Sequence, residues 1–114
     1  MKAIINGKVF TVTGQTFDKA TVLVDNGKIK AVGPDIELPE GTEVIDASGC
    51  WVVPGLIDVH FHGAVGHDFC DADDEGIAAI ARYEASQGVT ALFPTTMTLP
   101  EERLIPIVSS IAEH

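Results

Sequence analysis

Two histidines, His60 and His62, are the residues of this sequence best suited to carry out chemistry. They stand at the end of an apolar run that begins after a Pro-Gly pair, and Gly63 follows them directly. Side chains alternate between the two faces of a strand, so both imidazoles point to the same face. Neutral imidazoles bind zinc and similar divalent metals, which need three or four donors at about 2.0–2.2 Å. The pair therefore predicts half of a metal site, whose other ligands come from elsewhere in the fold.

A structural role is the alternative for this pair, because a bare His-x-His pattern is a weak motif. Two core histidines would each need a buried hydrogen-bond partner. Gly63 suggests instead a backbone kept open for a ligand. We therefore favour the metal hypothesis over the structural one.

Two further titratable residues lie near the pair in the sequence. Asp58, two residues before His60, shares its strand face. It could be a ligand, or a carboxylate that accepts backbone donors or orients a ligand histidine. His67 belongs to the loop beyond the strand, and we expect it to be a solvated bystander.

Two further groups of polar side chains are the threonines at residues 95–98 and the acidic residues at 71–75. Thr95, Thr96 and Thr98 could hydrogen-bond a polar ligand, although helix capping by Thr98 with Glu101 explains them well enough. The acidic run over residues 71–75 is most simply a favourable charge cluster at a helix N-terminus.

Composition excludes several classes of partner. The chain has 114 residues, of which 46% are hydrophobic, and 17 acidic against 7 basic residues give a net charge of −10. This charge repels nucleic acids and anionic membranes, so we expect a small metabolite as the partner. Cys50 and Cys70 are isolated, and no secretory segment precedes them, which favours free thiols and a cytoplasmic location. No apolar run approaches the about 20 residues that span a bilayer.

The first 53 residues predict a small β-domain. Strands over residues 2–5 and 8–12 flank Asn6-Gly7, a dipeptide suited to a two-residue hairpin turn. Strands over residues 20–24 and 28–32 form a second hairpin through residues 25–27. A loop over residues 37–42 and a short strand over residues 43–46 complete this part.

The period of the apolar residues changes after Pro54. A strand over residues 56–62 precedes an acidic loop over residues 63–74 and a helix over residues 75–87, which Gly88 ends. A buried strand over residues 89–93 follows, and then a second helix with Thr98 as its cap. Pro106 conflicts with this helix, so we expect a kink there or a later start.

Strand, helix, strand and helix in this order predict an α/β fold with parallel strands. We expect residues 54–114 to be the first two βα units of a (β/α)8 TIM-type barrel, preceded by a small β-sandwich-like domain at residues 1–53. Such a barrel has eight units and about 250 residues, and its active site lies at the C-terminal ends of the strands, where His60 and His62 lie. The sequence ends inside an apolar helical pattern, so we expect it to be the N-terminal part of a longer chain.

These motifs resemble the amidohydrolase superfamily of metal-dependent hydrolases. The resemblance covers the whole chain and includes an Asn-Gly-Lys-Val segment, an Asp-Asn-Gly-Lys-Ile segment and the entry into the barrel at residues 54–63. Within the superfamily, the loop from His62 to Asp71 is similar to the His-Gly-x-x-Gly-x-Asp-x-x-Asp of the N-acetylglucosamine-6-phosphate deacetylases. The segment Pro94-Thr95-Thr96 points the same way. His67 departs from the small residue expected at its place in this family.

The resemblance implies hydrolysis of N-acetylglucosamine 6-phosphate to glucosamine 6-phosphate and acetate. It implies a divalent metal ion, zinc first, with His60 and His62 as ligands. The general base, the remaining ligands and the phosphate-binding residues would lie beyond His114, so we expect these 114 residues alone to be inactive. We expect the full-length protein to be a homo-oligomer.

Other activities share the entry motif and stay open. A cyclic amidase similar to dihydroorotase or hydantoinase, or an adenine deaminase, is the nearest rival. A non-catalytic remnant that acts as an interaction module is the rival from a different class.

Overall fold

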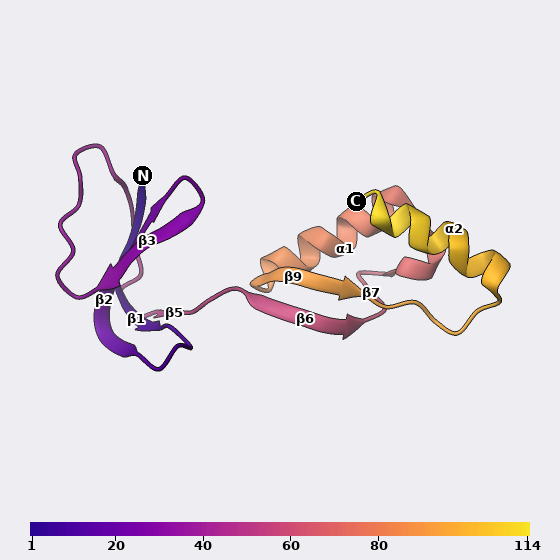
Figure 1. Ribbon diagram of the computed structural model, residues 1–114, viewed down its shortest axis with the longest axis horizontal. Helices are drawn as coiled ribbons and strands as arrows, with labels where there is room; N and C mark the ends of the chain where they lie inside the picture. Colours follow the sequence, from indigo (N-terminus) through magenta and orange to yellow (C-terminus); the bar gives the residue numbers. More distant parts are fainter. The chain divides into compact units, whose positions relative to one another are not determined.

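The computed structural model describes residues 1–114, which divide into two compact units, Met1–Pro54 and Gly55–His114 (Figure 1). The division falls within the Pro-Gly pair, one residue after the boundary expected from the sequence. Since proline and glycine interrupt regular pairing, this pair separates the hydrogen-bonding patterns on its two sides.

The first unit is a five-stranded sheet in the order β3-β2-β1-β4, in which β5 also pairs with β1. Its strands are β1 (Lys2–Phe10), β2 (Thr16–Asp25), β3 (Lys28–Gly33), β4 (Glu43–Asp46) and β5 (Trp51–Val52). β2 is antiparallel to β1 and to β3, whereas β4 and β5 are parallel to β1. Val9, Ala20 and Val22 form its core.

The predicted hairpin between β2 and β3 is confirmed. Asn26 and Gly27 take positive φ angles of 48° and 73° between the two strands. Asparagine and glycine tolerate this conformation best, which is why the local sequence signal is strong here. The strand over residues 43–46 is also confirmed, as β4.

The hairpin predicted at Asn6-Gly7 is wrong, because β1 continues through both residues. Asn6 has a φ of 62°, and the register between β1 and β2 shifts on either side of Gly7. The dipeptide thus forms an irregularity within one strand and no turn. A β-carbon on Gly7 would meet the side chain of Val52 and lie 3.1 Å from the β-carbon of Ala47, so these two side chains leave little room for a larger residue.

The second unit alternates strands and helices as the sequence predicts. Its elements are β6 (Leu56–Phe61), β7 (Gly63–Ala64), β8 (His67–Asp68), the 3-10 helix η1 (Phe69–Asp71), α1 (Asp74–Ser86), β9 (Val89–Pro94) and α2 (Glu101–Ala112). β6 and β9 pair in parallel, and β7 and β8 form a small antiparallel pair. The α/β class is therefore confirmed.

Both helices of this unit lie on one side of the β6–β9 pair (Figure 1). The core between them consists of Phe69, Ile77 and Ile80, against which Phe61 and Leu92 pack from the strands. Phe61 and Phe69 meet edge to face with ring centroids 5.2 Å apart. This core fixes the loop after β6 against the first helix.

The helix limits agree with the sequence at α1 and differ at α2. Gly88, with a φ of 86°, follows α1 as expected. α2 begins after Pro100 with no side-chain cap, so the predicted cap by Thr98 is wrong and the later start is confirmed. Pro106 lies inside α2. Neither helix is long and apolar enough to cross a membrane.

Candidate metal centre

The two histidines of the sequence motif lie at the carboxyl end of β6. His60 is within the strand, and His62 follows it directly. Because β9 runs parallel to β6, Thr95 follows its strand at the same edge. The main-chain N–H of Thr95 donates to the oxygen of Phe61 at 3.0 Å, which holds the two strand ends together.

The imidazoles of His60 and His62 lie next to each other. Their ring centroids are 5.1 Å apart and the planes meet at 88°. His60 is exposed and His62 is half-buried. The two rings are therefore neighbours at an accessible edge, as the alternation of side chains predicts.

The orientation of His62 is set by one hydrogen bond. Its Nδ1 lies 3.0 Å from the main-chain oxygen of Thr95. A carbonyl oxygen only accepts, so this contact requires the proton on Nδ1 and leaves the lone pair on Nε2. Metal-bound histidines characteristically donate their other ring N–H to a carbonyl or carboxylate, which fixes tautomer and direction. The residues present thus fit a divalent metal bound through Nε2 of His62.

Asp58 acts on the backbone of His60. Its Oδ1 accepts the main-chain N–H of His60 at 3.0 Å. The sequence left three roles open for Asp58, and this contact corresponds to the one in which the carboxylate accepts a backbone donor. Asp58 thereby stabilises the backbone of the strand at His60.

Gly63 has a different role from the one predicted. A β-carbon there would overlap the main-chain oxygen of His67 and lie 2.8 Å from Cα of Asp68. The space is therefore filled by β8, which pairs with β7. The interpretation of Gly63 as a backbone kept open for a ligand is wrong, because the glycine permits the chain to fold back on itself.

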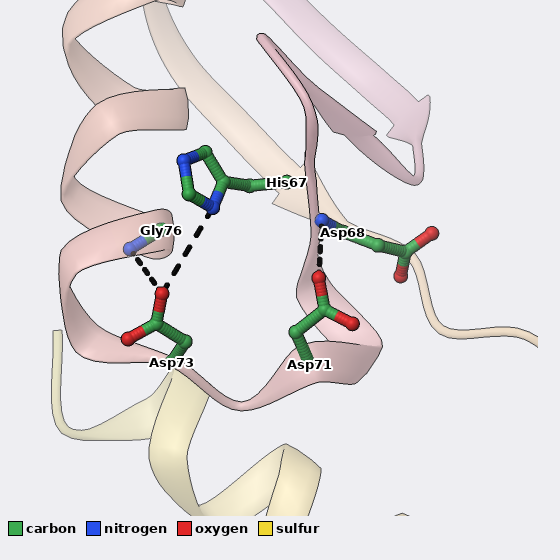
Figure 2. A network of polar contacts seen from close by, with 5 residues as sticks. All are labelled: His67, Asp68, Asp71, Asp73 and Gly76. Atoms are coloured by element: carbon green, nitrogen blue, oxygen red, sulfur yellow. Dashed lines mark hydrogen bonds and ion pairs between the residues drawn. The ribbon is translucent and has the colours of Figure 1, made fainter.

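His67 faces the first helix (Figure 2). Its Nδ1 is 3.9 Å from Oδ2 of Asp73, and its ring covers Gly76, where a β-carbon would lie 2.8 Å from that nitrogen. The side chain is 38% exposed, so it is partly covered and not fully solvated. Its partner, Asp73, is the N-cap residue of α1.

The acidic run has the predicted structural role. Asp73 is the N-cap of α1 and accepts the N–H of Gly76 at 3.0 Å, while Asp74 and Glu75 occupy the first turn. Asp68 caps η1, and its N–H donates to Asp71 at 3.0 Å (Figure 2). Carboxylates are favourable at these positions because helix N-termini carry partial positive charge.

The threonines after β9 contribute in different ways. The carbonyl oxygen of Thr95 holds His62, and its hydroxyl donates to the oxygen of Phe93 at 3.2 Å. Thr96 is half-buried and Thr98 is exposed. The role of the Thr95 main chain was not predicted, because any residue type supplies a carbonyl oxygen and the sequence carries no signal for it.

The two cysteines are free, as predicted. Cys70 has a contact that the sequence did not indicate, because its Sγ accepts the main-chain N–H of Met97 at 3.2 Å. No group of three or more His, Cys, Asp or Glu side chains in the chain is arranged to hold a metal ion. His60 and His62 are thus a partial ligand set.

Known proteins similar to this chain include dihydroorotases. A dihydroorotase from Geobacter metallireducens is 35% identical over 109 residues, which are 92% of this chain and 25% of the relative. No protein-family model matches. The chain therefore spans about a quarter of the length of this curated relative.

The solved structures that match at high probability include N-acetylglucosamine-6-phosphate deacetylases. The enzyme from Mycobacterium smegmatis matches with a TM-score of 0.86 and 26% identity, over 99% of this chain and 31% of its own. The enzyme from Pasteurella multocida gives 0.88 and 26%, over 98% of this chain and 30% of its own.

A hydantoinase structure also matches. D-Hydantoinase from Bacillus sp. AR9 gives a TM-score of 0.67 and 31% identity, over 99% of this chain and 24% of its own. Taken together, these similarities support a hydrolase of the amidohydrolase superfamily. They do not select one substrate, because the similar proteins include both deacetylases and cyclic amidases.

Proposed function

We propose that this chain, on the premise of its likeness to the amidohydrolase superfamily, is the N-terminal part of a metal-dependent deacetylase. Its substrate would be N-acetylglucosamine 6-phosphate, and its products glucosamine 6-phosphate and acetate. The observation that carries the metal-dependent part is the contact of His62 Nδ1 with the Thr95 oxygen at 3.0 Å, which leaves the lone pair of Nε2 free for a metal.

The proposed site uses His60 and His62 as ligands of one divalent metal, with zinc as the first candidate. A metal at this place would lower the pKa of bound water and polarise the amide carbonyl. His62 is kept in the tautomer that a ligand needs, and Asp58 fixes the backbone beneath His60. Two imidazoles bind zinc less tightly than a complete set of three or four ligands. The further ligands and the general base are therefore proposed to lie outside these 114 residues.

The same proposal extends to the architecture. β6, α1, β9 and α2 would be the first two units of a (β/α)8 barrel, whose C-terminal strand ends carry the site. The β-domain at residues 1–53 would be completed by strands from outside these residues. We also propose a cytoplasmic, homo-oligomeric enzyme that binds neither nucleic acid nor membranes, in line with the net charge of −10.

Deacetylation is favoured over ring opening by two observations. The loop from His62 to Asp71 is similar to that of the deacetylases, and the two deacetylase structures have higher TM-scores than the hydantoinase. A cyclic amidase is the second candidate, because the dihydroorotase from Geobacter metallireducens has the higher sequence identity.

The test is a pair of assays on the complete protein that contains this chain. Acetate release from N-acetylglucosamine 6-phosphate is measured beside hydrolysis of dihydroorotate, each with and without added zinc. Acetate release alone is the expected result. Ring opening alone would replace the deacetylase by the cyclic amidase.

A further inference from the structure

The loop after β9 is tied to the loop after β6 by a thiol. Cys70, in η1, accepts the main-chain N–H of Met97 at 3.2 Å, although the two residues are 27 positions apart. Sulfur is a weak acceptor, and its larger radius makes such contacts longer than those to oxygen. The contact bridges two segments that otherwise belong to different βα units.

Cys70 is itself held firmly. Its N–H donates to Oδ1 of Asp68 at 2.7 Å, a short, charge-assisted hydrogen bond. Asp68 and Asp71 form a reciprocal capping box around η1. Phe69, next to Cys70, is only 1% exposed and belongs to the core of the unit. The backbone that carries the Cys70 side chain is therefore held in place.

The tied loop is the one that orients His62. Thr95 lies two residues before Met97, and its carbonyl oxygen accepts the proton of His62 Nδ1. Hydrogen bonds hold the loop at Thr95, to Phe61, and at Met97, to Cys70. Met97 is half-exposed, so side-chain burial adds little to hold it. Loss of the sulfur contact would leave the two contacts at Thr95, to Phe61 and to His62, as the hydrogen bonds between this loop and the end of β6.

We propose that Cys70 is a positioning residue of the metal centre. Its sulfur holds the backbone at Met97, this keeps the Thr95 carbonyl opposite His62, and Nε2 of His62 stays directed at the metal. The inference rests on the proposed function, because it needs His62 to be a ligand. Cys70 itself does not touch the metal or the substrate in this role.

The test compares two substitutions of Cys70 in the complete protein with a matched control. Cys70→Ala removes the acceptor, whereas Cys70→Ser keeps an acceptor of similar size. Cys50→Ala removes the other free cysteine, which is exposed and lies in the first unit. Zinc affinity is measured by competition with a chelator, and far-UV circular dichroism checks that each variant is folded.

Partners that orient a metal ligand typically change metal affinity about 10- to 100-fold. We expect Cys70→Ala to weaken zinc binding about 10-fold, Cys70→Ser to recover most of the loss, and Cys50→Ala to change nothing. A second readout is the nitrogen NMR spectrum of the metal-free protein, in which Cys70→Ala should reduce the population of the His62 tautomer protonated at Nδ1.

Unchanged zinc affinity in Cys70→Ala would overturn the inference, and so would an equal loss in Cys70→Ala and Cys70→Ser. His62→Ala separates this outcome from failure of the proposed function. If His62→Ala loses zinc while Cys70→Ala keeps it, only the role of Cys70 is wrong. If His62→Ala also keeps zinc, the metal centre itself is wrong.

Discussion

Asp58 and His60 are joined within a single strand, because Oδ1 of Asp58 accepts the main-chain N–H of His60 at 3.0 Å. The pairing of β6 with β9 shifts register between Asp58 and Phe61, the stretch that contains this contact. A side chain thus satisfies a backbone donor where the strand pairing is irregular. This contact therefore stabilises the backbone at His60, the first candidate metal ligand.

This relationship predicts different effects for two substitutions of Asp58. Asp58→Asn keeps an oxygen that can accept the N–H, whereas Asp58→Ala leaves that donor to water. We expect Asp58→Ala to weaken zinc binding about 10-fold and Asp58→Asn to weaken it less. Chelator competition measures both affinities. An equal loss in both variants would show that the negative charge, which both remove, matters and the backbone contact does not.

Gly63→Ala is predicted to destabilise the second unit. The added β-carbon meets the main chain of His67 and Asp68, which cannot move without breaking the β7–β8 pair. Such overpacking costs about 1–3 kcal/mol in the free energy of unfolding. Urea titration of the complete protein measures this loss.

Gly33→Ala is the matched control for this prediction. It adds a β-carbon whose nearest neighbour is 3.9 Å away on Ile36. We expect its unfolding free energy to change by less than about 1 kcal/mol. An equal loss in both variants would mean that the close approach at Gly63 is not the cause.

The fold was more predictable from the sequence than the contacts of the site. The hairpin at Asn26-Gly27 and the helix stop at Gly88 depend on local backbone conformation, which residue types report directly. Asn6-Gly7 has the same local signal but lies inside β1, since tertiary pairing with β2 and β4 overrides the turn preference. Only long-range structure distinguishes the two cases.

Within the site, the residue types were predictable and their partners were not. The spacing of His60 and His62 places both imidazoles at one strand end. The Thr95 carbonyl and the N–H of Met97 are main-chain groups that every sequence supplies. Whether these groups form the two contacts depends on how two loops far apart in the sequence pack together, so no residue pattern predicts them.

Asp46 gives a pH-dependent prediction for the first unit. Hydrogen bonds from the Asn6 side chain, and from the hydroxyl and main chain of Ser48, hold the pKa of Asp46 below its ordinary value. A lowered pKa in the folded state means that the ionised carboxylate stabilises the fold at neutral pH. This contribution is lost as the pH falls below the ordinary aspartate pKa of 3.8 and through the lower pKa of folded Asp46.

The check uses Asp46→Asn beside the unchanged protein. Asparagine does not titrate, so the difference in unfolding free energy between the two should be present at pH 7 and shrink on acidification. Urea titrations between pH 7 and pH 3 follow it. A difference that stays constant over this range would contradict the assignment.

Residues 1–114 expressed alone are predicted to associate and to lack activity. The strand β6 exposes Leu56, Ile57 and Val59 at 56%, 62% and 71%. Large apolar side chains exposed on a strand favour association in water. Size-exclusion chromatography with light scattering gives the mass, and an acetate assay with added zinc gives the activity. A monomer with turnover would contradict both statements.

The most direct test of the account is the metal content of histidine variants of the complete protein. His60→Ala and His62→Ala each remove one proposed ligand, and His67→Ala removes a nearby histidine that faces Asp73 and the first helix. Zinc per chain is measured by inductively coupled plasma mass spectrometry after purification in zinc-containing buffer. The account predicts lower zinc in His60→Ala and in His62→Ala, with His67→Ala equal to the unchanged protein; full zinc in both His60→Ala and His62→Ala would contradict it.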